Sequence, residues 1–320
     1  ADGAPPAGAE AGEEAGGEAG GEEGEAEGPP PPAWVEVAEG HSDHVLCLSL
    51  HSRRAELAAS GGKDSVVYLW DVAQGQALRR TELPVNPTDV VFGRGASDHL
   101  LLTALDSTNA GMRGVVAAWD IEAGTRHYEI DAWQGHISCL GFSKTGDTFL
   151  VGAADGTVRQ HSSATGELIF SFASGMSDVN MVSLSASELY VQASGDRDQT
   201  YVLDRRRPDR PLHVLGHDAP ISLEFVNGVS AQWCHLAAST LVTGSDDGLV
   251  RIWDVSLGDP LVATLRGHSS PVSCVGVAPG DDLIASGGDE GKVVLYSSGG
   301  VKRGEVPLRL GAEQDNFLRY

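Results

Sequence analysis

The chain has 320 residues, of which 41% are apolar, so it is long enough for one large repeat domain or two ordinary domains. Its net charge of −23 argues against a general attraction to nucleic acid or to anionic membranes. Because no run of about 18 apolar residues is present, the sequence predicts no transmembrane helix.

Residues 1–33 contain only Gly, Ala, Pro and Glu with a single Asp, and they carry nine acidic and no basic side chains. A segment without large apolar side chains cannot offset the entropy that is lost on ordering. We therefore predict a disordered acidic leader, which is either a solvating tail or a docking segment for a basic partner. Residues 29–32 are all proline and are expected to form an extended polyproline II spacer.

Residues 34–320 are predicted to form the folded part of the chain. Short runs rich in Val, Leu and Ile alternate there with clusters of Gly, Asp, Asn and Ser, and no long stretch has helical periodicity. Mostly apolar runs of strand length, typical of strands covered on both faces, lie at 44–50, 147–153, 239–245, 271–278 and 282–288. The predicted fold class is all-β.

One strand end recurs along the chain at a nearly constant distance. The corresponding residues are Trp70, Trp119, His161, Leu203, Trp253 and Tyr296, which by subtraction lie 49, 42, 42, 50 and 43 residues apart. Gly-His pairs precede four of the six repeats, at 40–41, 135–136, 216–217 and 267–268. A period of this length with four strands indicates the blade of a β-propeller.

With Gly-His, a turn Asp and Trp-Asp recurring in this order, the chain resembles the WD-repeat (β-transducin-like) family of β-propellers over residues 34–310. The resemblance implies four-stranded blades and six visible repeats that end near residues 71, 120, 161, 204, 254 and 297. Residues 34–37 and 303–310 both look like outer strands, and they would compete for one edge of a six-bladed ring. We therefore expect seven blades in the complete protein, with residues 302–320 as the start of a truncated seventh repeat; a closed or open six-bladed propeller is the alternative.

The resemblance also implies a hydrogen-bonded set of His, Ser or Thr, Asp and Trp in each blade, which we call the blade clamp. The carboxylate accepts from one imidazole nitrogen, the other nitrogen accepts from the hydroxyl, and the hydroxyl oxygen accepts from the indole. The predicted members are His41, Ser60, Asp64 and Trp70 in the first repeat, His217, Thr243, Asp247 and Trp253 in the fifth, and His268, Ser286, Glu290 and Tyr296 in the sixth. The second, third and fourth repeats lack members, and we expect them to be less rigid or held by their neighbours.

A set of Asp, His and Ser also suggests a catalytic triad, but the set recurs in several repeats and has no Gly-x-Ser-x-Gly motif beside it. The sequence contains no phosphate loop, no zinc-ligand spacing and no HExxH motif. We therefore predict that the chain is not an enzyme and that it has no cofactor-binding and no metal-binding residues.

The four cysteines, Cys47, Cys139, Cys234 and Cys274, show no CxxC spacing. Cys47, Cys139 and Cys274 lie in apolar runs, where cysteine is typically a small buried residue of a protein in a reducing compartment. No pattern of a secretory signal is visible at the start of the chain. We expect an intracellular protein, in the cytoplasm or the nucleus.

Three segments depart from the repeat pattern and are candidates for partner binding, because propeller strands hold their loops rigidly. They are residues 106–113 with Asn109 and Arg113, residues 226–232 followed by Trp233, and the basic cluster of Arg205, Arg206, Arg207 and Arg210. We place the basic cluster on a connecting loop, where it grips an acidic partner or a phosphate, or pairs with local acids or with the acidic leader. The other two segments are interaction loops or tolerated insertions.

The predicted function is a non-catalytic scaffold that presents rigid propeller loops to protein or peptide partners within a multiprotein complex. Direct binding of nucleic acid, membrane or a small-molecule substrate is not expected. One alternative is a substrate receptor of a cullin-type ubiquitin ligase, although Leu203-Asp204-Arg205-Arg206 departs at its first residue from the Trp-Asp-x-Arg of such receptors. The other alternative is a regulatory subunit of an enzyme.

Overall fold

The computed structural model describes residues 40–105, 113–133, 135–195, 199–218 and 228–307. These residues all belong to one compact unit, residues 37–320. They form six antiparallel sheets of four strands, in which the strands are hydrogen-bonded in chain order. The prediction of an all-β fold built from four-stranded propeller blades is confirmed.

The first three sheets contain β1 (Val45–Leu50), β2 (Leu57–Gly62), β3 (Val66–Asp71) and β4 (Gln76–Glu82); β5 (Pro87–Phe92), β6 (Leu100–Leu105), β7 (Gly114–Asp120) and β8 (Arg126–Trp133); and β9 (Ile137–Phe142), β10 (Thr148–Ala153), β11 (Thr157–Ser162) and β12 (Leu168–Ala173). The last three contain β13 (Met181–Leu184), β14 (Tyr190–Ser194), β15 (Gln199–Asp204) and β16 (Arg207–Gly216); β17 (Val229–Trp233), β18 (Thr240–Ser245), β19 (Leu249–Asp254) and β20 (Leu261–Arg266); and β21 (Val272–Val277), β22 (Leu283–Gly288), β23 (Lys292–Ser297) and β24 (Lys302–Pro307). A 3-10 turn at Gly95–Ser97 lies between β5 and β6.

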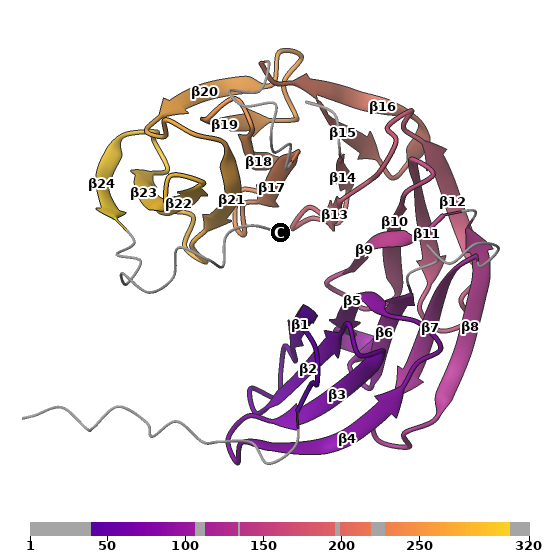
Figure 1. The fold of residues 1–320 in the computed structure, drawn as a ribbon. Coiled ribbons are helices and arrows are strands. Elements are labelled where there is room, and N and C mark those ends of the chain that lie inside the picture. Colours follow the sequence, from indigo (N-terminus) through magenta and orange to yellow (C-terminus); the bar gives the residue numbers. More distant parts are fainter. Residues whose placement is uncertain (1–39, 106–112, 134, 196–198, 219–227, 308–320) are drawn as a thin grey trace, which may run out of the picture. The chain divides into compact units, whose positions relative to one another are not determined.

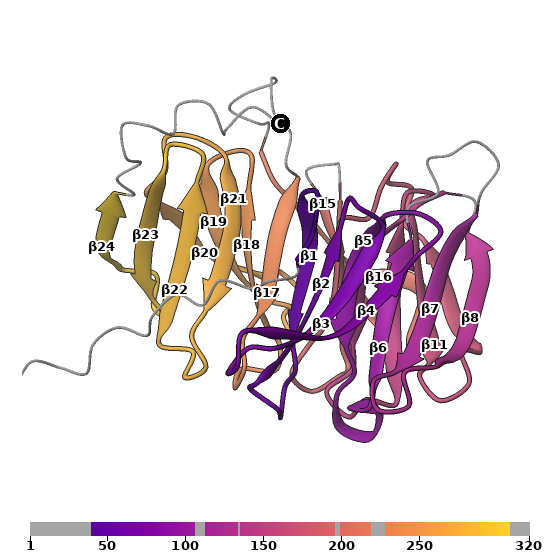
Figure 2. The same cartoon turned by 60° about the horizontal axis from the view of Figure 1, so that its bottom comes forward.

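The recurring strand ends of the sequence all lie in the third strand of a sheet. Trp70 and Trp253, for example, occupy the same place in β3 and β19, one residue before the terminal Asp. The strand that follows each of them pairs with it, so a sequence repeat begins with the fourth strand of the preceding sheet. In both views of the fold, the fourth strands such as β8 and β24 lie at the outer ends of their sheets (Figures 1 and 2).

The turn before the third strand needs a backbone in the left-handed region. Gly248 has φ 74° there, and Ser65 occupies the corresponding place in the first sheet with φ 59°. The carboxylate of the preceding Asp accepts the first backbone N–H of the strand, at 2.9 Å from Leu249 to Asp247. This is why Asp-Gly before an apolar run is repeated along the chain.

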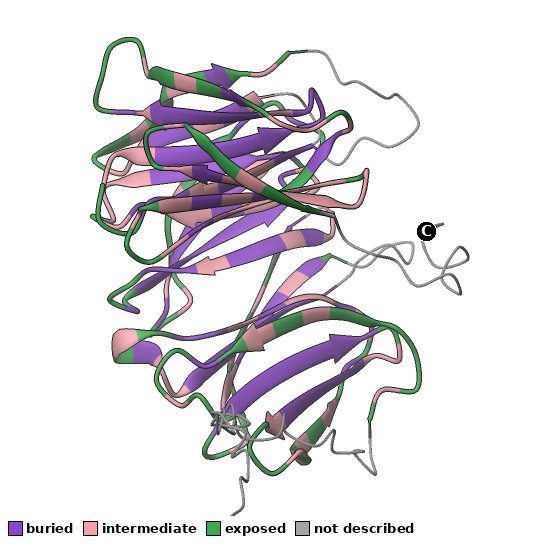
Figure 3. Cartoon of the chain, turned by 90° about the vertical axis from the view of Figure 1, so that its left-hand side faces the viewer, coloured by how far each residue is buried: buried purple, intermediate pink, exposed green. Residues whose placement is uncertain are grey.

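Apolar side chains fill the spaces between successive sheets. The first strands, such as β1 and β5, contact one another from each sheet to the next. Each of the five interfaces contains one cluster of buried residues; that between the second and third sheets is built around Trp133, Ile137 and Phe149. The buried surfaces therefore lie between the sheets, and exposed residues lie mainly at turns and outer strands (Figure 3).

The first and sixth sheets each keep one uncovered face. No strand contact like that between β1 and β5 joins these two sheets within the part of the chain that the structure describes (Figure 1). On the first sheet, Leu48 is 65% and Leu50 is 67% exposed, whereas Val90 and Phe92 at the same register positions of the second sheet are 1% and 2% exposed. The difference arises because a preceding sheet covers β5 and no described sheet covers β1.

The last described strand, β24, pairs with β23 as the fourth strand of the sixth sheet. Residues 302–307, which the sequence assigns to the start of a seventh repeat, therefore also complete the sixth blade. Residues 34–37 and 308–320 lie outside the described residues. The seventh blade and the boundary of the acidic leader stay predictions.

The prediction of buried cysteines is wrong for Cys274. All four cysteines are free thiols, Cys139 and Cys234 are buried, Cys47 is half-buried, and Cys274 is exposed. The thiol of Cys139 contacts the carbonyl of Val179, in the connection that leads into the following sheet, at 3.2 Å. Cys274 occupies the same position of the sixth sheet, which has no following sheet among the described strands.

Candidate partner-binding site

The blade clamp of the first sheet is joined by side-chain hydrogen bonds. His41 donates from Nδ1 to Asp64 Oδ1 at 2.9 Å, and its Nε2 accepts from the Ser60 hydroxyl at 2.7 Å. Trp70 donates from its indole Nε1 to the same hydroxyl oxygen at 2.7 Å. The four residues come from the entry to β1, from β2, from the turn after it and from β3, so the clamp ties the inner strands together.

In the fifth sheet the hydroxyl of Thr243 takes the central place. It lies 2.9 Å from His217 Nε2 and accepts from Trp253 Nε1 at 2.8 Å. Asp247 accepts the backbone N–H of Asp218 at 3.0 Å and pairs with the buried Arg251 guanidinium at 2.5 Å. Arg251 is a member that the sequence did not predict.

In the sixth sheet the clamp has three linked members and one that stands apart. His268 lies 2.7 Å from Glu290 Oε1 and 2.6 Å from Ser286 Oγ. The hydroxyl of Tyr296 is buried and makes no hydrogen bond of normal geometry with the described residues, although burial raises its pKa and the Ser286 hydroxyl partly opposes this shift. Tyr296 thus fills the volume of the clamp Trp without providing its hydrogen bond.

Two carboxylates of these clamps have shifted ionisation. Burial of Asp64 opposes its charge, but hydrogen bonds from His41 and the backbone of Ser42 outweigh burial and lower its pKa. Burial likewise opposes ionisation of Glu290, and the hydrogen bond from His268 lowers its pKa overall. Both carboxylates are therefore acceptors at neutral pH, as the clamp requires.

A glycine beside the clamp provides the room for it in two sheets. A Cβ on Gly62 would lie 2.3 Å from His41 Nδ1, and one on Gly288 would lie 2.5 Å from His268 Nδ1. This role of the glycines was not predicted, although Gly-Gly at the end of β2 and again at the end of β22 is a visible signal in the sequence.

The second, third and fourth sheets hold their strands by other contacts. Trp119 donates to Thr103 at 3.1 Å without a histidine in the set. His161 stacks on Phe149 with ring centroids 5.4 Å apart, and its Nδ1 lies 2.9 Å from the Gly166 carbonyl oxygen. In the fourth sheet a buried chain of hydroxyl and amide groups runs from Gln192 through Ser194 to Thr200.

The clamps offer little that resembles an active site. Each hydroxyl that a histidine contacts in the first and fifth sheets also accepts from a tryptophan, so it is enclosed in the sheet and is not an exposed nucleophile. Within the described residues, no group of three or more His, Cys, Asp or Glu side chains is arranged to hold a metal ion. The clamps connect strands, and exposed side chains must provide any partner contact.

The arginine cluster lies only in part where it was predicted, since Arg205 and Arg206 are in the connecting turn and Arg207 and Arg210 are in β16. The sequence places it on a connecting loop, but β15 ends at Asp204 and β16 begins at Arg207, so Arg205 and Arg206 form a tight hairpin turn. Asp204 and Arg207 are paired across this hairpin. The cluster therefore belongs to the outer edge of the fourth sheet, because its second half is part of the outermost strand (Figure 1).

Two of the arginines are engaged by carboxylates. Arg206 contacts Asp204 with its guanidinium at 2.6 Å, and this hydrogen bond is the main reason why the pKa of Asp204 is lowered. Arg205 donates to the Glu188 carbonyl oxygen at 2.8 Å and lies 3.7 Å from its carboxylate. These pairs fix the hairpin.

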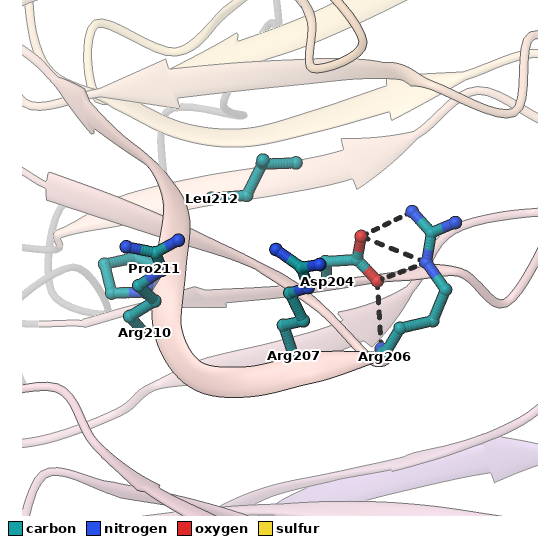
Figure 4. Close-up of a pocket in the computed structure, with 6 residues that line it drawn as sticks. All are labelled: Asp204, Arg206, Arg207, Arg210, Pro211 and Leu212. Atoms are coloured by element: carbon teal, nitrogen blue, oxygen red, sulfur yellow. Dashed lines mark hydrogen bonds and ion pairs between the residues drawn. The ribbon is translucent and has the colours of Figure 1, made fainter.

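Arg207 and Arg210 are exposed and make no hydrogen bond or ion pair with the described residues. Together with Asp204, Arg206, Pro211 and Leu212 they line an open groove of about 690 Å³, which we call the arginine groove (Figure 4). Its rim is cationic and one end is apolar. Of the predicted partner-binding residues, the structure brings together Arg206, Arg207 and Arg210, which line this groove.

The other predicted contact residues do not join this groove. Trp233 is 5% exposed, lies in β17 and stacks on Tyr190 with ring centroids 6.2 Å apart, so its assignment as a partner-binding loop residue is wrong. Residues 228–232 continue into this strand and cover the fourth sheet. Arg113 is exposed just before β7, and Asn109 lies outside the described residues.

A second exposed surface is the first-sheet face, formed by Leu48 and Leu50. The two side chains are two residues apart in the regular part of β1 and therefore share one side of the strand. Both are exposed, whereas Leu46 belongs to a bulge at which the register shifts between Val45 and Cys47. Sequence reasoning could not find this surface, since the same apolar pattern is buried in the other sheets.

The family model "WD domain, G-beta repeat" matches residues 34–71, 128–162, 209–254 and 259–297. The unmatched second repeat ends in Trp119 without a Gly-His, and the unmatched fourth ends in Leu203. Among the described residues, no helix is both long enough and apolar enough to cross a membrane.

Several known proteins are similar to this chain. Rik1-associated factor 1 of Schizosaccharomyces pombe is 28% identical over 185 residues, which cover 54% of this chain and 28% of that protein. Eukaryotic translation initiation factor 3 subunit I of Aspergillus terreus is 25% identical over 274 residues, which cover 80% of each protein. The solved structure of the Dos1 propeller superposes with a TM-score of 0.71 at 23% identity, over 83% of this chain and 71% of that one.

Proposed function

Since this chain is a WD-repeat protein built from β-propeller blades, we propose that it is a non-catalytic scaffold that binds other proteins within a multiprotein complex. Two relatives have names that fit this role, because one is called a subunit of a translation initiation factor and the other a factor associated with Rik1. The free thiols support an intracellular, reducing location, which we propose as cytoplasm or nucleus.

The observation that carries the proposal is the exposure of the first-sheet face. Burial of a leucine side chain stabilises an interface by about 1.5–3 kcal/mol, so a pair of exposed leucines on one side of β1 is an apolar contact surface. The interface of the first and second sheets shows what fits such a face, namely the apolar face of another β-sheet. A partner that offers such a surface, or the seventh blade that the sequence predicts, would bury Leu48 and Leu50.

The cullin-receptor alternative receives less support from the hairpin. In Leu203-Asp204-Arg205-Arg206 the acidic residue and the final arginine pair with each other at 2.6 Å. The apolar Leu203 is fully buried in the sheet. A general scaffold, unlike a cullin-type receptor, does not need Leu203 or the Asp204–Arg206 pair to be available for binding.

The test is affinity purification of the tagged full chain from cell extract, with the Leu48→Asp/Leu50→Asp variant beside it. Leu168→Asp/Leu261→Asp is the matched control, because these leucines are exposed on outer strands. We expect specific partner chains with the unaltered protein and the control, and their loss from the first-sheet variant at an unchanged thermal midpoint. A lowered midpoint of this variant would mean that a blade of the chain itself covers the first-sheet face. The scaffold proposal fails if no protein co-purifies and the chain instead turns over a small molecule.

A further inference from the structure

We propose that the arginine groove binds an acidic, partly apolar segment of a partner protein, at the outer edge of the fourth sheet and independently of the first-sheet face. Residues 204–210 contain four arginines and two aspartates, which leaves a local charge of +2 on a chain whose net charge is −23. A cationic patch on an acidic protein attracts acidic partners selectively, because the rest of the surface repels them.

An irregularity in the pairing of β15 with β16 places Arg207 and Arg210 at the groove. The pairing of β15 with β16 passes from Asp204 opposite Arg207 to Leu203 opposite Pro211, so residues 208–210 bulge out of the ladder. A bulge redirects side chains, and here it lets Arg207 and Arg210 line the same groove despite their odd spacing (Figure 4). Such a bulge in an exposed strand is typical of a functional edge.

The presence of two cations favours a segment with two carboxylates. Arg207 and Arg210 are separate side chains that line one groove, so each can bind its own carboxylate along a peptide. Arginine binds carboxylates through two parallel hydrogen bonds. Arg207 acts on the Asp204 carboxylate only through its charge, and neither arginine makes a hydrogen bond or ion pair with the described residues, so binding of a carboxylate breaks no such pair.

The apolar end of the groove defines the rest of the ligand. Leu212 is 43% exposed and Val214, two residues further along β16, is 48% exposed. An apolar side chain next to the acidic residues of the segment would cover them. The segment does not extend the sheet, because Pro208 and Pro211 lack the N–H groups that a further strand would need.

The experiment is fluorescence anisotropy with a labelled synthetic peptide in which glutamates alternate with leucines and serines. The full chain is compared with Arg207→Glu/Arg210→Glu and with the control Arg266→Glu/Arg303→Glu, which makes the same charge change on exposed arginines of β20 and β24. We expect binding that weakens with salt, a loss of about tenfold or more in the groove variant and about twofold or less in the control. A peptide with Lys in place of Glu should not bind.

Three results would overturn the proposal. The first is an equal loss in both variants, since the attraction would then come from total charge. The second is full displacement of the peptide by equimolar inorganic phosphate. The third is peptide binding only after removal of residues 1–33, which would make the acidic leader the occupant. Partner capture through the first-sheet face is unaffected by any of them.

Discussion

Trp70 donates its indole N–H to the hydroxyl oxygen of Ser60, 2.7 Å away, and this hydroxyl in turn donates to His41. The Ser60→Ala variant leaves the indole N–H and the imidazole nitrogen without their partner inside the first sheet. Each buried polar group left unpaired costs about 1–3 kcal/mol. We expect a thermal midpoint lowered by several degrees, measured by circular dichroism.

The control for this variant is Ser298→Ala, because Ser298 is exposed in the turn between β23 and β24. It should change the midpoint by less than about a degree. An equal effect of the two substitutions would show that the clamp hydroxyl does not stabilise the blade.

Removing the polar atom of Trp253 and of Tyr296, which occupy the same place in the clamps of the fifth and sixth sheets, should affect the stability of the protein differently. Trp253→Phe deletes the donor to Thr243 at 2.8 Å together with part of a buried ring, and we expect a loss of about 2–4 kcal/mol. Tyr296→Phe deletes a buried hydroxyl that makes no hydrogen bond of normal geometry with the described residues and only a weak contact with Ser286, so stability should be unchanged or rise by up to about 1 kcal/mol. Urea unfolding of both variants decides the question, and a clear loss with Tyr296→Phe would mean that its hydroxyl is bound.

The clamps could be predicted from the sequence because their members have fixed places relative to the end of the third strand. The role of Arg251 could not, since the equivalent position holds arginine in β11 but tyrosine in β3 and β15, so no residue type recurs there in every sheet. Trp233 was misplaced for a related reason: Val229–Trp233 mixes small polar and apolar residues and reads as a loop until its pairing with β18 is known.

The exposed surfaces depend on contacts that no local pattern records. Leu48 and Val90 occupy the same register position, and only the presence of a preceding sheet makes one buried and the other exposed. The arginine cluster was visible as a charge run, but its position on an outer strand follows from a hairpin turn of only two residues. The bulge that places Arg210 in the groove likewise depends on the register in which β15 pairs with β16, and no local sequence pattern records this register.

Arg251 should be among the most sensitive positions of the fifth sheet. Its guanidinium bridges the buried Asp247 and the exposed Asp218, at 2.5 and 2.8 Å. Arg251→Met leaves the Asp247 carboxylate buried without a counter-charge, which costs about 3–5 kcal/mol. Urea unfolding should show this as a large fall in the midpoint concentration.

The same substitution at Arg159 provides the comparison, because Arg159 occupies the equivalent position of β11. It lies 3.7 Å from Asp155, and both side chains are partly exposed. We expect a smaller loss there. A double variant, Arg251→Met/Asp247→Asn, should recover part of the stability; if it is no better than Arg251→Met, the cost does not come from the orphaned charge.

Asp89 should make the stability of the protein depend on pH in a direction unusual for an aspartate. It lies on β5, and its carboxylate accepts the backbone N–H of Leu140 on β9 at 2.8 Å. Burial raises its pKa from 3.8 to about 6, although the backbone hydrogen bonds from Leu140 and Val90 oppose the shift. The folded protein therefore binds a proton more tightly than the unfolded chain, and the contribution of Asp89 is most favourable below pH 3.8 and is lost as the pH rises through about 6.

Asp89→Asn removes this titration and keeps an oxygen that can accept from Leu140. After allowance for the partial exposure of Asp89, we expect the variant to gain about 1–2 kcal/mol on the unaltered protein between pH 4 and pH 7.5. The free energy of unfolding in urea, measured across this range, checks the trend. Asp209→Asn makes the same charge change at an exposed site of β16 and should give a flat difference; a flat difference for Asp89→Asn as well would mean that Asp89 ionises as readily in the folded protein as in the unfolded chain.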